Sequence, residues 1–235
     1  MIETLNNVTI GGKHMYKDFG FILTTKEITP PEAQTKYVDV PMRDGSIDMS
    51  ETLSDEVKYK NRTITMKFTY TGARSLWSSK FTEVAEAIHG IRQKIVFDDD
   101  SGFYYMGRTT IEGWDMTGKF VVMTLTCDVE PYKYDAVSSL DDWIWDTLDF
   151  ENGYINDLSG LEVNGSIDTI LICRKKSTCP TFIVQGDISL MYEGNMYKLK
   201  EGSHKLYDVI VREGENKLSF SGNGTVSVDY VGGTF

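Results

Sequence analysis

The chain has 235 residues, a mass of 26.6 kDa, and 35 acidic against 24 basic residues, so its net charge is −11. This charge argues against a general nucleic-acid binder, which needs a basic surface, and against docking on anionic membranes. Hydrophobic residues make up 40% of the chain, enough for a packed core, while no apolar run reaches the roughly 18–20 residues of a membrane helix and no signal peptide is expected.

The first part of the chain is predicted to consist mainly of β-strands. Gly11-Gly12-Lys13 indicates a turn that opens a first hairpin, because a phosphate loop would need an earlier glycine and a following Ser or Thr. Apolar and polar residues alternate over Arg62–Tyr70 and again over 121–129. This period of two places one apolar face on each strand.

One helix is expected between these two strands. Its apolar positions lie at helical spacing, at Phe81, Val84, Ala85 and Ile88. Ser78 or Ser79 is the expected N-cap, and Gly90 suits the left-handed position just after the helix. Because the apolar stripe is single, the helix should cover one face or end of a sheet.

A hairpin with an acidic turn follows the helix. Its strands are predicted at 94–97 and 103–106, and its turn holds Asp98, Asp99 and Asp100. A metal cluster or a carboxylate pair for glycoside hydrolysis is the alternative interpretation. Adjacent side chains in a turn point in different directions, which favours a solvated acidic loop.

The pattern changes near Pro131, which is expected to end a strand because it lacks a ladder donor. We therefore expect two domains, 1–135 and 136–235. The second reads as entirely β, with Gly194-Asn195 as a two-residue hairpin turn. Further turns are predicted at Gly202-Ser203, 213–216 and Gly222-Asn223-Gly224, a spacing typical of a β-sandwich.

Catalytic and metal-binding motifs are weak throughout. The three cysteines, Cys127, Cys173 and Cys179, are expected to remain thiols in a reducing cytosol, and no zinc-type spacing surrounds them. None of the three histidines, His14, His89 and His204, has a nucleophilic partner that the sequence identifies. The segment 44–48 offers oxygens at calcium-type spacing but lacks the glycine and glutamate of an EF-hand, which favours a tight turn. Trp143 and Trp145 would share one face of a strand and could stack on sugars, fill a core or anchor an interface.

Several stretches carry a likeness to a known family. They are Asp18-Phe19-Gly20-Phe21, 40–48, 96–100 leading to 104–108, and 130–134 in the first segment, then 194–199, 214–222 and 224–230 in the second. In this order and spacing, the chain resembles the distal tail proteins (Dit) of long, non-contractile-tailed bacteriophages. One departure is Met42, where the family often has Gly before Arg43.

The resemblance implies a mainly β protein without catalysis or cofactor. The N-terminal domain would be a tail-tube-like α+β barrel or sandwich with one helix, and the C-terminal domain a galectin-like β-sandwich. Such proteins form a homohexameric ring in the virion that joins the tail tube protein to the tail-tip and receptor-binding proteins and lets DNA pass. They are made in the host cytoplasm, with no specific nucleic-acid binding and no membrane insertion.

Two groups of residues gain candidate roles from this resemblance. The stretch from about Thr25 to Lys60 is expected to be an arm that clasps neighbouring subunits, and its candidate contact residues are Pro30, Pro31, Arg43 and Asp44. An ordinary long surface loop is the alternative. Asp98, Asp99 and Asp100 are candidate channel acids, although a hairpin on the outer rim explains them equally well. The alternative function is a carbohydrate-binding module that recognises host glycans through the C-terminal sandwich. A third hypothesis is an enzyme that acts on cell-wall sugars.

Overall fold

The protein divides into two compact units in a computed structural model. The structure describes residues 6–52, 56–116, 118–136 and 158–235. Unit 1 comprises Met1–Lys133 together with Phe235, and unit 2 comprises Tyr134–Thr234.

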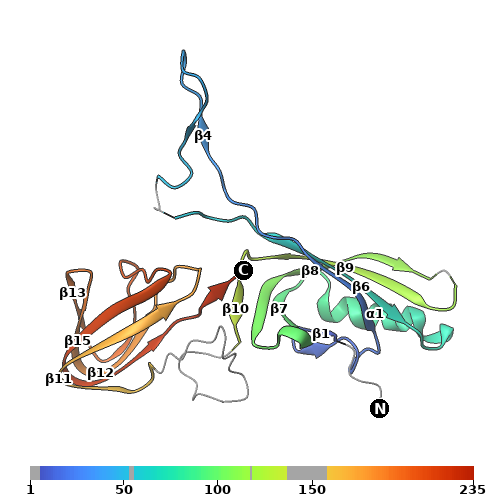
Figure 1. The fold of residues 1–235 in the computed structure, drawn as a ribbon. Coiled ribbons are helices and arrows are strands. Elements are labelled where there is room, and N and C mark those ends of the chain that lie inside the picture. Colours follow the sequence, from blue (N-terminus) through green and yellow to red (C-terminus); the bar gives the residue numbers. More distant parts are fainter. Residues whose placement is uncertain (1–5, 53–55, 117, 137–157) are drawn as a thin grey trace. The chain divides into compact units, whose positions relative to one another are not determined.

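Unit 1 is built on one antiparallel sheet with the strand order β2-β1-β7-β8-β9-β6-β3 (Figure 1). Its elements are β1 (Val8–Ile10), β2 (Lys13–His14), β3 (Ile22–Ile28), β4 (Tyr37–Val38), β5 (Ile47–Asp48), β6 (Arg62–Tyr70), η1 (Arg74–Leu76), α1 (Trp77–Ile88), β7 (Arg92–Phe97), η2 (Asp98–Asp100), β8 (Phe103–Asp115) and β9 (Val121–Val129). The small pair β4–β5 forms a separate sheet.

The alternating strands of unit 1 are confirmed. In β6 the apolar residues Ile64, Met66 and Phe68 are fully buried, and in β9 the odd-numbered residues 121–129 are fully buried too. The two strands pair in register from Arg62 opposite Val129 to the far ends. The first hairpin turns at Gly11-Gly12, and the β7–β8 hairpin also forms as predicted.

The helix is confirmed, but its predicted N-cap is wrong. α1 begins at Trp77 and has Leu76 as its N-cap, with no side-chain capping bond. The bulky Trp77 is buried, and its Nε1 donates to the carbonyl of Gly72, 3.0 Å away. This anchor starts the helix ahead of the serines. Gly90 has φ +74°, as the left-handed position after the helix requires.

A buried arginine lies where β6 begins. Arg62 is 6% exposed, and its Nε and Nη2 atoms have no hydrogen-bond partner among the described residues. These two atoms form the edge of a guanidinium that normally pairs with a carboxylate. The cation lies 4.9 Å from the centre of the Tyr105 ring. Burial lowers the pKa of Arg62 and raises the pKa of Tyr105.

Replacing Arg62 by methionine is expected to raise the free energy of unfolding by about 1–2 kcal/mol. The change removes two unpartnered buried donors and keeps a flexible side chain that can fill the space. Urea denaturation measures the effect, with Arg62→Lys as the control that keeps the charge and should be destabilising. A loss of more than about 1 kcal/mol in Arg62→Met would show that the contact with Tyr105 outweighs the missing hydrogen bonds.

A long excursion connects β3 to β6. We call residues 29–61 the arm, because every described residue in it is exposed or half-buried. Its two sides pair at Ala33 and Tyr59, and β4 pairs with β5 nearer the tip. Figure 1 shows the arm as a narrow ribbon that continues from β3 and β6. The predicted arm began at Thr25, but the residues up to Ile28 belong to β3 and pair with β6.

Unit 2 is a second antiparallel sheet with the order β11-β15-β12-β13, and β14 also pairs with β12. Its elements are β11 (Leu161–Cys173), β12 (Thr181–Tyr192), β13 (Asn195–Leu199), β14 (Gly202–Lys205) and β15 (Gly214–Asp229), with β10 (Lys133–Asp135) and β16 (Gly233–Thr234) at its boundaries. The β12–β13 turn is Glu193-Gly194, one residue earlier than predicted, and both residues have positive φ.

The long strands of unit 2 bend at glycines. Gly222 and Gly224 lie inside β15, so the turn predicted there is wrong. Burial continues on even-numbered residues on both sides of them, which places these glycines on the inner side of the bend. Gly186 of β12 faces Gly224. A Cβ atom at any of these three positions would overlap a backbone carbonyl oxygen of the neighbouring strand.

The bend folds the sheet of unit 2 over its own core. Phe182 pairs with Val228 at one end of the sheet, and Phe220 pairs with Leu190 beyond the glycines. The two phenylalanine rings nevertheless meet edge to face, with their centres 6.1 Å apart. One hydrophobic cluster therefore fills the interior of unit 2. Among the described residues the chain is thus mostly β-strand with one α-helix, and the predicted fold class is confirmed.

Candidate assembly surfaces

The three predicted channel acids form η2, and each carboxylate is paired with a different base. Asp98 accepts from His14 at 3.1 Å, Asp99 from Lys26 at 2.5 Å, and Asp100 from Lys133 at 2.7 Å. The three partners come from β2, β3 and β10. We call Asp98–Asp100 the aspartate turn. Its ion pairs and hydrogen bonds link three segments that are distant in sequence.

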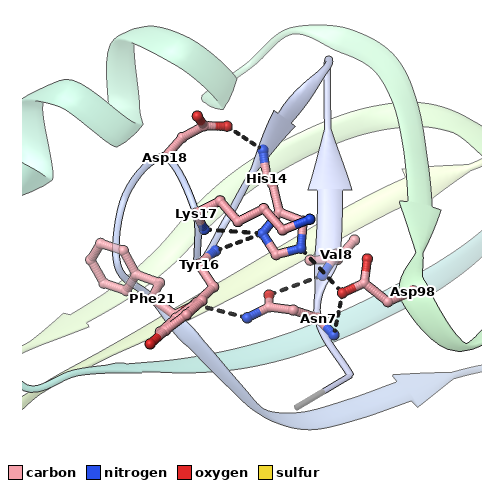
Figure 2. A network of polar contacts seen from close by, with 8 residues as sticks. All are labelled: Asn7, Val8, His14, Tyr16, Lys17, Asp18, Phe21 and Asp98. Carbon is pink, nitrogen blue, oxygen red and sulfur yellow. Dashed lines mark hydrogen bonds and ion pairs between the residues drawn. The ribbon is translucent and has the colours of Figure 1, made fainter. Parts of the chain in front are cut away.

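The pairing of His14 is fixed by its backbone neighbours, as Figure 2 shows. Its Nδ1 atom accepts hydrogen bonds from the backbone N–H groups of Tyr16 and Lys17, both at 3.1 Å. The ring proton must therefore lie on Nε2, which donates to Asp98. The same carboxylate oxygen accepts from the backbone N–H of Asn7. Asp98 is held by two donors from the N-terminal hairpin region.

The two lysines of the aspartate turn also contact aromatic rings. The Lys26 ammonium lies 4.5 Å from the centre of the Phe97 ring, and the Lys133 ammonium lies 4.2 Å from that of Phe103. Each cation is thus held between a carboxylate and an aromatic face. Lys26 and Lys133 offset the charges of Asp99 and Asp100, whereas the neutral His14 leaves Asp98 its charge. The role of the three aspartates as channel acids remains a prediction.

The arm exposes an unusual amount of apolar surface. Its large exposed apolar side chains are Tyr37, Val38, Val40, Met42, Met49 and Val57. Single exposed apolar residues are ordinary, but a run of them on one narrow projection is typical of an interaction site. Of the predicted contact residues, Arg43 and Asp44 lie beside Met42 near the tip, whereas Pro30 and Pro31 lie at the root near β3.

The root of the arm is fastened by aromatic rings. Tyr132 and Phe235 stack with their centres 5.3 Å apart and their planes at 13°. Tyr59, from the returning side of the arm, meets Phe235 edge to face at 4.8 Å. No sequence pattern indicates this cluster, because Tyr59 is 73 residues away from Tyr132 and still farther from Phe235. These ring contacts fasten the returning side of the arm at its root.

A solved structure shares this architecture. One match is the crystal structure of SPP1 Dit (gp 19.1), described as a paradigm of the hub adsorption apparatus in phages that infect Gram-positive bacteria. The TM-score is 0.63 at 11% sequence identity, over 97% of this chain and 99% of that one. The chain has the Dit fold. No protein-family model and no curated protein matches it.

The residues considered for metal or catalytic chemistry make other contacts in the described ranges, 6–52, 56–116, 118–136 and 158–235. In those ranges no group of three or more His, Cys, Asp or Glu side chains could hold a metal ion. The Asp48 carboxylate of the calcium-like segment instead accepts from the backbone and hydroxyl of Ser50. His89 accepts from the backbone of Ile111. Trp143 and Trp145 lie outside the described residues.

No helix within the described ranges is long and apolar enough to cross a membrane.

The cysteines of this Dit-fold chain are free thiols in different environments. Cys127 and Cys173 are buried, whereas Cys179 is half-buried. Burial raises the pKa of Cys127 to about 11, and its Sγ lies 3.4 Å from the Thr109 hydroxyl.

Thiol labelling at pH 8 is expected to modify Cys179 first and Cys127 only after unfolding. A thiolate is the reactive species, and at pH 8 a thiol with a pKa near 11 is almost entirely protonated. The measurement is mass spectrometry of alkylated peptides with and without urea. Rapid labelling of Cys127 in the native protein would show that this part of the sheet opens readily.

Proposed function

We propose that this protein is a structural component of a phage tail, at the hub where the tail meets its adsorption apparatus. The observation that carries the proposal is the extent of the fold match, which spans nearly the whole of both chains. A match over one unit alone would fit many β-sheet proteins, because a fold by itself does not fix a function. A match that covers both units, in the same order along one chain, is more specific than a match to one unit.

The finer form of the proposal is a homohexameric ring. Unit 1 would form the ring, and the arm would contact a neighbouring copy through its exposed apolar residues. The ring would join the tail tube protein to the tail-tip and receptor-binding proteins and leave a channel for DNA. A net charge of −11 on each copy suits a channel that duplex DNA does not adhere to. This role needs no catalytic group.

Negative-stain microscopy of the purified protein tests the ring. Ring-shaped particles with a central opening would support the proposal, and particles of any other symmetry would contradict it. Fluorescence anisotropy with a short DNA duplex at physiological salt tests the channel. Tight binding there would contradict a passive conduit.

The second candidate function is glycan recognition by unit 2. The resemblance to galectin-like sandwiches is what favours it, and the described residues add no cluster of exposed aromatic rings on one sheet face. A glycan array probed with the full-length protein separates the two functions. Binding that is abolished by Trp143→Ala or Trp145→Ala would favour the lectin.

We also propose that the two domains, 1–135 and 136–235, fold independently. Separate hydrophobic clusters in the two units support this. Limited proteolysis is expected to give fragments that end near residue 135, because linkers between compact domains are cut first. Cleavage confined to residues 136–235, without a stable N-terminal fragment, would contradict it.

A further inference from the structure

The turn that follows β2 is held by the imidazole of a histidine. The His14 side chain is 13% exposed, and its Nδ1 atom accepts hydrogen bonds from the backbone N–H groups of Tyr16 and Lys17. On the opposite side of the imidazole, Nε2 donates to Asp98, as Figure 2 shows. We call residues 14–18 the histidine turn. Its link to the aspartate turn depends on an Nδ1 atom that carries no proton.

The geometry of the histidine turn is one that other residue types usually provide. A side-chain acceptor for the backbone N–H groups two and three residues further on is typical of Asn, Asp, Ser and Thr, at turns and at helix starts. An asparagine at position 14 would accept at any pH between 5 and 8. Histidine fits the same geometry, but it is the side chain that gains a proton in this range. Histidine at position 14 therefore makes the turn sensitive to acid.

Protonation sets the two sides of the imidazole against each other. Both nitrogens of an imidazolium are donors, so Nδ1 would face two N–H groups that also donate. Nε2 would keep its hydrogen bond to Asp98, and that bond would become charge-assisted. The Asp98 carboxylate thus holds the cation in place, and the loss falls on the backbone of the histidine turn.

The charged groups around His14 support this order of events. Asp98 comes from η2, and Asp18 and Lys17 come from the histidine turn itself. Lys13 precedes His14 in β2, and neighbouring residues of a strand point to opposite faces. The charge bonded directly to the imidazole is the Asp98 carboxylate, which favours the cation.

We propose that His14 is an acid-sensitive latch, whose imidazole below about pH 6 stays on Asp98 and releases the two backbone N–H groups of the histidine turn. This inference goes beyond the proposed ring of subunits and does not depend on it. Met15 and Phe19 are buried in the core of unit 1, so release of the turn loosens the cover of that core. The 3.0 Å bond from the Asp18 N–H to the His14 carbonyl is not affected, which keeps the change local.

Hydrogen–deuterium exchange of the full-length protein, read by mass spectrometry at pH 7.5 and pH 5.0, tests the latch. After correction for the intrinsic effect of pH on exchange, the peptide that contains Tyr16 and Lys17 is expected to exchange about tenfold faster at pH 5.0. In His14→Asn the side-chain oxygen accepts at both pH values, so the same peptide should change by less than about threefold. The series stops at pH 5.0 because carboxylates in general gain their protons below it.

Two controls locate the titrating group. Asp98→Asn keeps an acceptor oxygen for Nε2 but removes the charge, so the rise in exchange should move to a lower pH. The backbone N–H of Ile111 donates to Nδ1 of His89, and its peptide reports on this second histidine in the same experiment. That peptide should respond alike in the wild type and in His14→Asn.

Two outcomes would overturn the latch. The first is a wild-type peptide with Tyr16 and Lys17 that stays equally protected at pH 5.0, a result that requires no variant to fold. The second is an equal rise in the wild type and in His14→Asn, because the titrating group would then lie elsewhere. Neither outcome bears on the ring of subunits, which particle shape and mass in solution test separately.

Discussion

Replacing Gly224 by alanine is expected to lower the free energy of unfolding of unit 2 by about 4 kcal/mol. The added Cβ would overlap the carbonyl oxygen of Gln185 in β12, and the backbone at Gly224 has φ +152°. Both effects act at the bend, where Gly224 of β15 pairs with Gly186 of β12. Because neither atom of the overlap lies at the end of a flexible side chain, the sheet itself would have to shift. Urea denaturation followed by circular dichroism measures the change.

The matched control is Gly165→Ala in β11. Gly165 is exposed and lies opposite Gly222 in the same sheet with φ +88°, but a Cβ there would have no atom within 4 Å. Gly165→Ala should lower the free energy of unfolding by only about 1–2 kcal/mol, which is the cost of placing alanine at positive φ. Equal losses at the two positions would show that conformation alone, and not the close crossing of two strands, sets the requirement for glycine.

Shortening the arm is expected to abolish self-association while unit 1 still folds. The design replaces residues 35–57 by Asn-Gly, so that Gln34 and Lys58, whose backbones are hydrogen bonded at 2.7 Å, flank a two-residue turn. None of the described residues removed is buried, and Tyr59 keeps its ring contacts with Tyr132 and Phe235. The thermal midpoint should change by less than about 3 °C.

Size-exclusion chromatography with light scattering measures the loss of assembly. A control with Lys36→Ser in the intact arm changes a polar exposed residue and should leave association unchanged. A shortened protein that still assembles would show that ring contacts come from the sheet edges of unit 1. A shortened protein that unfolds would show that the arm contributes to the fold of unit 1.

The sequence allowed the regular parts of this fold to be predicted because burial there follows a period. Alternation identified β6 and β9, and helical spacing identified α1, although Phe81 of the apolar stripe proved exposed. The N-cap failed because a buried anchor, Trp77, set the start of the helix. Such tertiary contacts override local capping preferences.

Features that depend on partners distant in sequence escaped prediction. Gly222-Asn223-Gly224 has the composition of a turn, and only the approach of β12 shows that it bends a strand. The aspartate turn has the composition of a solvated loop, and only the fold brings a base to each carboxylate. The positive φ of Met42 agrees with the glycine that the resembled family often has at this position. Methionine in place of that glycine therefore strains the backbone of the turn.

The mass of the purified protein in solution tests the central claim most directly. Light scattering over a range of concentrations, with and without the tail tube protein, should show a species near 160 kDa, the mass of six 26.6 kDa chains. A monomer that converts to this species at high concentration or with the tube protein present fits equally well. A stable dimer or trimer under all these conditions would contradict the ring.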